Sequence, residues 1–293
     1  MDDMIRQMGY VVVATPQAAA SAADLAAING LTVTDSRPDR IQLSSNQRSC
    51  EVLFVQADRP GILAVGLEAR DAAAVDEIAR RVASDGCEIL NDKPSVARVA
   101  RAIRFRTPFG PIIEVHTPVP REPVLPQNRP GLHAKRLDHV NLRVNDPRGF
   151  HDFVTTALGM RLSDRTENYG RAWYRAGDGF HHTFAAGPGD GLHHYGFDAH
   201  SLLDLAAVAD GLRLKGRTLL WGIGRHGPGN NIFSYYQDLN GCVVETSFGM
   251  ERFDEDATRT AGVWSEAELM KILDVWGSQP PAHYGKALTP FVS

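Results

Sequence analysis

Residues 191–199 read GLHHYGFDA, and residues 61–69, at the corresponding place 130 positions earlier, read GILAVGLEA. Two further pairs of segments repeat with nearly the same spacing. MGYVVVAT (8–15) aligns with LDHVNLRV (137–144) at a spacing of 129, and FGPIIEV (109–115) aligns with NGCVVET (240–246) at a spacing of 131. Three matches in the same order along the chain indicate two copies of one structural block.

Each block contains the same order of elements twice. A strand-like run is followed by a helical segment, and then by short runs in which apolar and polar residues alternate between glycine turns. We therefore predict an α+β protein of four β-α-β-β-β units. The units should pair into two half-open barrels, because the inner face of each sheet must be covered by another sheet. The predicted helices lie within 15–30, 71–86, 146–160 and 201–216.

A proline-rich stretch separates the two blocks. Residues 116–139 contain five prolines, and proline fixes φ and removes a hydrogen-bond donor, so we predict an extended linker at 120–133. The blocks are then expected at 1–119 and 134–250.

The remaining tail, residues 251–293, is predicted to contain one amphipathic helix, in SEAELMKILDVWG (265–277). Ser265 would be its N-cap, Glu268 would occupy the capping-box position, and Gly277 would end it. This helix could be a lid or could cap an oligomer interface, but packing against the core is the default for its apolar face.

The composition limits the class of protein. A hydrophobic content of 43% and a charged content of 23% are ordinary globular values. The net charge of −4 gives no electrostatic reason to expect nucleic acid or an anionic membrane as a partner. Three cysteines without a Cys-x-x-Cys pair argue against a disulfide framework, and the apolar run near the N-terminus is too short to span a membrane. We therefore expect a soluble cytoplasmic protein.

Two histidines and one glutamate stand at matched places of the repeat in the second block only. They are His139, His194 and Glu245, and the first block has Tyr10, Ala64 and Glu114 at these places. If the histidines merely suited a strand, both copies should contain them. We therefore predict one metal centre in the second block and a metal-free, structural first block. Two imidazoles and one carboxylate with open positions are typical of a non-haem Fe(II) oxygenase, and Mn(II) has similar preferences.

Pairs of adjacent histidines raise the question of which member faces this centre. Side chains alternate along a strand, so His193 should point away from His194 and lie partly exposed or behind it. The pair His181 and His182 is expected on the strand before His194. The same alternation leaves open which of these two faces the metal.

The segment QDLNG (237–241) contains Asn-Gly, which is a strong signal for a hairpin turn. Folding the chain back at this turn places Tyr235 opposite Glu245 and directs Tyr236 to the other face. A tyrosine and the nearby His226 could transfer protons beside a metal.

The order of these residues resembles that of the type I extradiol ring-cleavage dioxygenases of the vicinal oxygen chelate superfamily. The most specific part is GRHGPGNNIFSYYQDLNGCVVE (224–245), which has Gly-x-His, a Tyr-x-x-Asp turn and a final Glu. The resemblance covers about residues 1–250. It implies the vicinal oxygen chelate (glyoxalase-like) fold, a symmetric homo-oligomer, and O₂-dependent cleavage of a catechol-type aromatic beside its hydroxyl groups.

The resemblance also implies residue roles. His139, His194 and Glu245 would hold Fe(II), with Mn(II) as the other possible ion. His182, rather than His181, would be the acid/base residue, and Tyr235 and His226 would hydrogen-bond the substrate oxygens.

Two alternatives remain at this point. A glyoxalase-like isomerase of the same superfamily would need a second carboxylate at the metal. A protein of the same fold that binds an aromatic compound or confers resistance without turnover would need no metal ligands.

Overall fold

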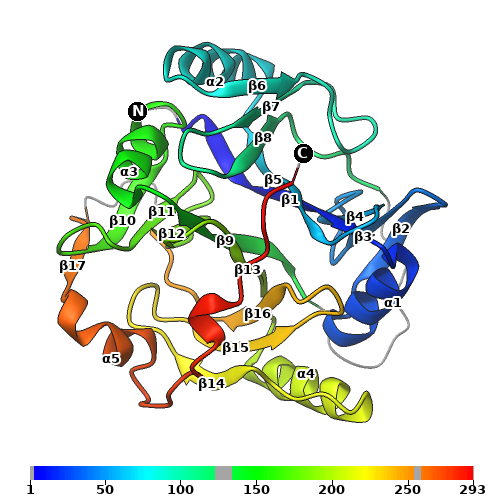
Figure 1. The fold of residues 1–293 in the computed structure, drawn as a ribbon, viewed down its shortest axis with the longest axis vertical. Coiled ribbons are helices and arrows are strands. Elements are labelled where there is room, and N and C mark those ends of the chain that lie inside the picture. The colour runs from blue at the N-terminus through cyan, green and yellow to red at the C-terminus, as the bar shows by residue number, and fades with distance from the viewer. Residues whose placement is uncertain (1–2, 123–133, 254–258, 293) are drawn as a thin grey trace.

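The computed structural model describes residues 3–122, 134–253 and 259–292, and it shows two large mixed sheets with helices at the periphery (Figure 1). The chain passes four times through the order of one strand, one helix and three strands. The predicted α+β fold of four such units is therefore confirmed. Most of the linker predicted at 120–133 falls at 123–133, outside the described residues.

The first two units share one sheet. Unit one consists of β1 (Ile5–Thr15), α1 (Ala18–Asn29), β2 (Thr32–Arg37), β3 (Arg40–Ser44) and β4 (Val52–Gln56). Unit two consists of β5 (Gly61–Ala69), α2 (Ala72–Ser84), β6 (Glu88–Asn91), β7 (Ala102–Arg106) and β8 (Ile112–His116). The strand order is β2-β3-β4-β1-β5-β8-β7-β6, so the units meet where β1 and β5 pair antiparallel.

The last two units build the second sheet in the same way. Unit three consists of β9 (Arg136–Val144), α3 (Pro147–Thr156), β10 (Arg161–Thr166), β11 (Ala172–Arg175) and β12 (Phe184–Pro188). Unit four consists of β13 (Gly191–Asp198), α4 (Leu202–Leu214), β14 (Trp221–Arg225), β15 (Ile232–Gln237) and β16 (Val243–Phe248). Here β9 and β13 form the joint, in the order β14-β15-β16-β13-β9-β12-β11-β10-β17.

The helices begin at residues suited to that place. Asp71 precedes α2 and accepts a hydrogen bond from the free backbone N–H of Ala74. Asp146 does the same for α3, whose first residue, Pro147, needs no hydrogen-bond acceptor. Each helix then buries one apolar face against its sheet. The buried residues are Ala74, Val75, Ile78 and Val82 in α2, and Phe150, Phe153 and Val154 in α3.

The strand registers confirm the internal repeat. Val12 pairs with Ala64 between β1 and β5, and the matched residues Asn141 and His194 pair between β9 and β13. The two sheets are therefore copies of one another down to single residues. When a side chain occurs at a position in one sheet but not at the matched position in the other, the fold itself does not require that side chain.

A buried ion pair joins the first sheet to the beginning of the second. Arg48 and Glu51 lie between β3 and β4, they are 4% and 0% exposed, and their side chains contact one another directly. Oε1 of Glu51 also accepts the backbone N–H of Leu137 in β9, at 3.0 Å. Arg48 donates to the carbonyl oxygen of Met8 in β1, at 2.7 Å. The pair thus fixes β9 against β1.

We expect Glu51→Gln to lower the free energy of unfolding by about 3–5 kcal/mol, because it leaves the Arg48 guanidinium buried without its counter-charge. Burial raises the pKa of Glu51, but Arg48 and hydrogen bonds from Ser45 and Leu137 outweigh it and hold this pKa below 4.5. The stabilisation of the folded state by ionised Glu51 should therefore be present above pH 4.5 and be lost as the pH falls. Urea unfolding at several pH values checks this. The control is Glu77→Gln, which removes a surface carboxylate. Equal stability of the two variants would contradict the prediction.

The helix predicted at 265–277 is much shorter than expected. The segment contains a 3-10 turn, η1 (Glu266–Glu268), and a five-residue helix, α5 (Leu269–Leu273). Neither the predicted N-cap Ser265 nor Glu268 makes a capping hydrogen bond through its side chain.

The cause of the early end is Asp274. Its carboxylate accepts hydrogen bonds from the backbone N–H groups of Arg225 and Trp276, and this turns the chain away from the helical path. Gly277 therefore lies beyond the helix rather than at its end. Trp276 is 54% exposed, so the predicted continuous apolar face is not formed.

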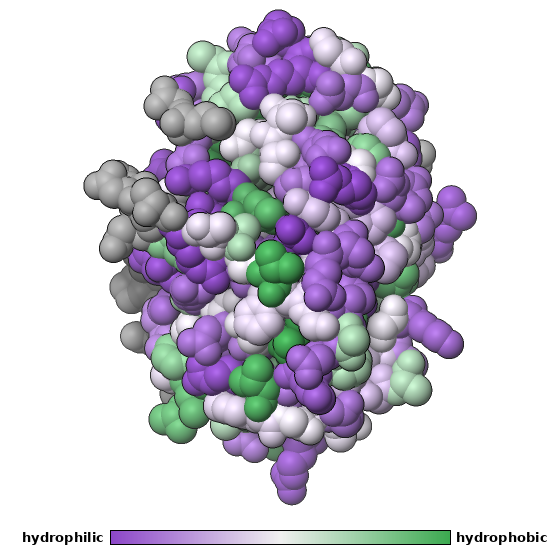
Figure 2. All heavy atoms as spheres, turned by 90° about the vertical axis from the view of Figure 1, so that its left-hand side faces the viewer, coloured by the Kyte–Doolittle hydropathy of each residue, from purple (hydrophilic) through white to green (hydrophobic). Residues whose placement is uncertain are grey.

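The tail also adds a strand that was not predicted. The strand β17 (Gly262–Trp264) pairs with β10 and covers that edge of the second sheet. Figure 2 shows the face that carries this edge; it is mostly hydrophilic, with apolar side chains in small separate groups. The last turn is η2 (Tyr284–Lys286). In the described part of the chain, no helix is long and apolar enough to cross a membrane.

Candidate metal centre

Three neighbouring strands bring the predicted metal ligands together. His139 lies on β9, His194 on β13 and Glu245 on β16, and β13 pairs with both of the other strands. The Nε2 atoms of the two histidines are 3.3 Å apart, and each lies 3.1 Å from Oε2 of Glu245. All three side chains are buried. Within the described residues, no other group of three potential ligands lies this close together.

The spacing of these atoms fits a single metal ion. If the bonds to the ion are about 2.1 Å long, donor atoms that are 3.1–3.3 Å apart subtend roughly 95–104° at the ion. Such angles are close to those of one triangular face of an octahedron. Positions opposite that face would stay open for other ligands, as in the two-histidine, one-carboxylate sites of non-haem iron oxygenases.

Hydrogen bonds behind the two histidines direct their lone pairs toward this point. Nδ1 of His139 lies 2.9 Å from the carboxylate of Asp138, which accepts its hydrogen. Nε2 of His193 lies 3.1 Å from the carbonyl oxygen of Tyr284 and must donate to it. Nδ1 of neutral His193 therefore accepts from Nδ1 of His194, at 2.7 Å. In both His139 and His194, Nε2 is then the nitrogen without a hydrogen.

Three acceptor atoms that converge in a buried place require a positive charge between them. Burial by itself lowers the pKa of His139, but the carboxylates of Asp138 and Glu245 overcome it and raise this pKa to about 10. A proton on His139 is one way to supply the charge. A divalent cation supplies it better, because it contacts all three atoms at once.

His193 takes the second of the two arrangements expected for it. It points away from the converging atoms and lies behind His194, and it is 1% exposed. The tail covers this side of β13, where Leu192 forms a β-bridge with Thr289. The contact with Tyr284 therefore makes His193 a fixed support for His194.

The matched place in the first sheet is occupied differently. Glu114 on β8 forms an ion pair with Arg104, at 2.6 Å, and accepts hydrogen bonds from Ser95 and from the hydroxyl group of Tyr10. Tyr10 stands where the second sheet has His139. A guanidinium thus balances the carboxylate where a metal would be needed in the other copy. This arrangement supports a structural role for the first block.

A glycine provides the space for His139. Gly196 pairs with His139 on one side and with Glu245 on the other, and a Cβ atom on it would lie 2.2 Å from the His139 ring. In the first sheet, Gly66 is placed in the same way, and its Cβ would lie 2.6 Å from the Tyr10 ring. Any side chain at either glycine must displace the ring beside it.

We expect Gly196→Ala to weaken metal binding by about 10–100-fold, as loss of a group that orients a ligand typically does, because His139 is pushed out of position. Gly66→Ala is the matched control, since it crowds an equivalent ring that faces no metal site. Iron titration of both variants, with circular dichroism to check the fold, tests this. Wild-type affinity in Gly196→Ala would show that His139 does not need this position.

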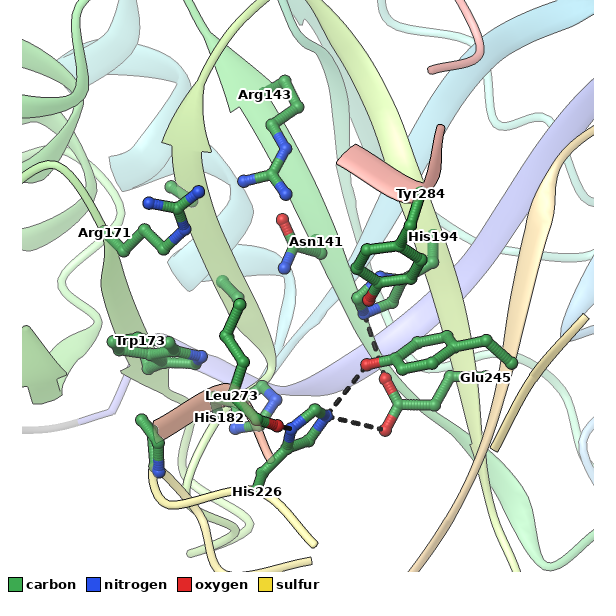
Figure 3. A pocket seen from close by; sticks show the side chains of 14 residues that line it. Asn141, Arg143, Arg171, Trp173, His182, His194, His226, Glu245, Leu273 and Tyr284 are labelled. Atoms are coloured by element: carbon green, nitrogen blue, oxygen red, sulfur yellow. Dashed lines mark hydrogen bonds and ion pairs between the residues drawn. The ribbon is translucent and has the colours of Figure 1, made fainter. Parts of the chain in front are cut away.

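A pocket opens beside the converging atoms (Figure 3). His194 and Glu245 line it, and so do His182, His226 and Tyr235, the other side chains predicted for the site. The tail closes one side of it with Leu273 and Tyr284. Residues that sequence reasoning did not assign to the site also line it: Asn141, Arg143, Arg171, Trp173, Ala185, Ala186 and Pro228.

Tyr235 and His226 form a hydrogen-bonded pair of fixed direction. Tyr235 lies opposite Glu245 across β15 and β16, as predicted. Nδ1 of His226 lies 2.5 Å from the carbonyl oxygen of Leu273 and must donate to it, so Nε2 accepts the Tyr235 hydroxyl hydrogen, at 2.9 Å. Burial lowers the pKa of His226 and raises that of Tyr235 well above its usual value, so both stay neutral. Tyr236 packs in the core.

His182 approaches the centre beside His139. Its ring centroid lies 4.7 Å from that of His139, and its Nδ1 lies 3.0 Å from Nδ1 of His181. Nε2 of His181 in turn lies 3.3 Å from Asp164. Of the two histidines, His182 is the one that lines the pocket. They lie in the turn before β12, which begins at Phe184, so their predicted position on the strand itself is wrong.

Comparison with known families finds a match in the second half of the chain. The model of the Glyoxalase/Bleomycin resistance protein/Dioxygenase superfamily matches residues 136–246, which contain all three converging side chains. Metapyrocatechase 2 of Cupriavidus necator is 24% identical over 275 residues, which cover 87% of this chain and 84% of that protein. The manganese-dependent 2,3-dihydroxybiphenyl 1,2-dioxygenase of Geobacillus genomosp. 3 is 25% identical, over 94% of this chain and 95% of that protein.

Solved structures share the fold over the whole chain. Homoprotocatechuate 2,3-dioxygenase of Brevibacterium fuscum, in its anaerobic complex with 3,4-dihydroxyphenylacetate, matches 99% of this chain and 94% of its own, with a TM-score of 0.91 and 20% identity. The Mn(II)-bound glyoxalase of Novosphingobium aromaticivorans matches 100% of this chain and 96% of its own, with a TM-score of 0.83 and 24% identity. The match to the Glyoxalase/Bleomycin resistance protein/Dioxygenase superfamily model is confined to residues 136–246, the part of the chain that contains His139, His194 and Glu245.

Proposed function

We propose that the protein is an extradiol dioxygenase, which cleaves the ring of a catechol-type aromatic with O₂ at one Fe(II) or Mn(II) ion. The observation that carries this proposal is the convergence of His139, His194 and Glu245 beside a pocket that His182, His226 and Tyr235 also line. Relatives named as catechol-cleaving dioxygenases support it, and one of these is manganese-dependent. The metal ligands in this proposal are the two histidines and the glutamate.

A bound ion would supply a Lewis acid with open positions, where the catechol oxygens and O₂ meet. The chain supplies everything around it. Because the Tyr235 hydroxyl group donates to His226, its oxygen is left to accept a hydrogen bond from a substrate hydroxyl. Tyr235 and His226 therefore orient the substrate and can take up the proton of a catechol hydroxyl.

His182 lines the same pocket and is placed for proton transfer next to His139. Burial and the neighbouring histidines His139 and His181 hold its pKa well below the usual value, so it is neutral at pH 7. A neutral imidazole can accept a proton and return it in a later step. The contact with His181 fixes its orientation.

The tail forms part of the pocket lining. The cavity has a volume of about 40 Å³, which is room for a few water molecules but not for an aromatic ring. The pocket must therefore widen when a catechol enters. Leu273 and Tyr284 are the lining side chains that the tail contributes.

A metal-dependent isomerase is the second candidate, because glyoxalases share this superfamily and one of them shares the fold. Such an enzyme needs a second carboxylate at the metal. In the described part of the chain, Glu245 is the carboxylate that converges with the two histidines, while Asp138 lies behind His139. The ligand set therefore favours the dioxygenase.

Oxygen uptake distinguishes these functions. Protein loaded anaerobically with Fe(II), or with Mn(II), is mixed with a panel of catechols in air-saturated buffer. We expect O₂ consumption together with the visible absorbance of a ring-opened product. Metal binding without O₂ consumption on any catechol would overturn the proposal in favour of the isomerase. Failure to bind metal, with aromatic binding intact, would identify a non-catalytic binding protein.

A further inference from the structure

Arg143 is a buried cation that has no carboxylate partner in the described part of the chain. It lies on β9, four residues after His139, so alternation places both side chains on the same face of the strand. The residue is 7% exposed and lines the pocket. No carboxylate among residues 3–122, 134–253 and 259–292 forms an ion pair with it. Burial and the nearby Arg171 lower its pKa to about 10, so it stays charged at pH 7.

The structure makes room for this guanidinium. Arg143 pairs with Gly187 of β12, and a Cβ on that glycine would lie 2.2 Å from Nη1 of Arg143. At the matched places of the first sheet, Ala14 pairs with Val55. In the second sheet, the large Arg143 therefore stands where the first has Ala14, and the small Gly187 stands where the first has Val55. Like the metal ligands, this arginine is an addition to one copy only.

A second arginine faces the same part of the pocket. Cγ of Arg171 would lie 3.5 Å from a Cβ atom on Gly187, beside Arg143. Figure 3 shows the two guanidinium groups on one side of the pocket, with Asn141 between them and the metal-binding side chains. Glu266 lies 3.1 Å from Arg171 and neutralises one charge. The charge of Arg143 remains.

We infer that the aromatic substrate carries a carboxylate group, which Arg143 and Arg171 bind while the catechol oxygens face His194 and Glu245. This inference rests on the proposed function. An unpaired buried guanidinium is costly in the free protein, and a carboxylate is the group whose shape and charge match it. The pocket would therefore select acidic catechols over neutral ones of the same size.

The test compares acids with their amides. The pairs are 3,4-dihydroxybenzoate with 3,4-dihydroxybenzamide, 2,3-dihydroxybenzoate with its amide, and 3,4-dihydroxyphenylacetate with its amide. For the best pair we expect kcat/KM to be about 100-fold or more higher for the acid. Anaerobic titration calorimetry on the metal-loaded protein should show the same preference in binding. Equal values for acid and amide in every pair would overturn the inference and leave the proposed function intact.

Variants assign the preference to residues. Arg143→Met should abolish the preference, because kcat/KM should fall much more for the acid than for the amide. The matched control, Arg148→Met, removes a positive charge from the exposed side of α3 and should keep the preference. If Arg143→Met does not fold, Arg171→Met should reduce the preference in the same direction. An unchanged preference in the folded Arg143 variant, or an equal loss for acid and amide, would contradict the inference.

Calorimetry also separates the two claims. If no catechol is cleaved, the proposed function fails, while the acid-over-amide binding still tests the carboxylate site. If acids do not bind better than amides there, the inference fails as well.

Discussion

Protein carrying His194→Ala should bind Fe(II) at least about 100-fold more weakly than the wild type and should show no measurable ring cleavage. Loss of a residue that only orients a metal ligand costs 10–100-fold in affinity, and loss of the ligand itself should cost more. Nε2 of His194 lies 3.3 Å from that of His139 and 3.1 Å from Glu245, so its removal leaves two of three donor atoms. Metal analysis after dialysis, alongside oxygen uptake, measures both effects.

Two controls show whether this loss is specific. His200→Ala removes an exposed histidine next to α4, away from the converging atoms. Glu114→Gln removes the carboxylate that matches Glu245 in the first sheet, where Arg104 is its partner. Both should keep the wild-type iron content. Full iron content in His194→Ala, or its loss in Glu114→Gln, would mean that the metal lies elsewhere.

The second large effect is expected at His182. His182→Ala should keep its iron and lower kcat by about 10²–10⁴-fold, which is the usual contribution of a general acid or base. His182 lines the pocket beside the proposed metal centre, but it is not one of the three converging residues, so its loss should spare the iron. Single-turnover kinetics on protein with verified iron content isolates the chemical step.

A matched change at Tyr235 separates proton transfer from substrate orientation. Tyr235→Phe removes the hydroxyl group that donates to His226, at 2.9 Å, and should raise KM as well as lower kcat. In His182→Ala the loss should fall mainly on kcat. Wild-type kcat in His182→Ala would exclude it as the acid/base residue.

The order of elements and the converging residues could be predicted because the chain carries its own comparison. Matching Tyr10 with His139 and Glu114 with Glu245 separates side chains that the fold needs from side chains that chemistry needs. The registers of β1 with β5 and of β9 with β13 agree with that match residue by residue. The Asn-Gly hairpin turn in QDLNG then correctly placed Tyr235 opposite Glu245.

Features that depend on the tail could not be predicted, because the tail has no counterpart in the first block. His193 is buried through Tyr284, which is 91 residues away in the chain. The short α5 ends where Asp274 accepts the backbone N–H of Arg225, 49 residues away. Local propensity favours a longer helix, and these long-range hydrogen bonds override it.

Arg143 is a different case, because a signal for it was present. Residues 139, 141 and 143 are every second residue of β9 and therefore lie on one face. The residue of the first block that matches Arg143 is Ala14. The comparison that found the histidines also applies to this arginine. The sequence alone could not show that no carboxylate within the described residues pairs with this arginine.

An anomalous difference map from Fe(II)-loaded crystals, collected at the iron edge, tests the central claim most directly. One peak per chain is predicted, about 2.1 Å from Nε2 of His139, Nε2 of His194 and an oxygen of Glu245. A map without a peak between these three side chains, or with its peak beside Glu114, would contradict the account.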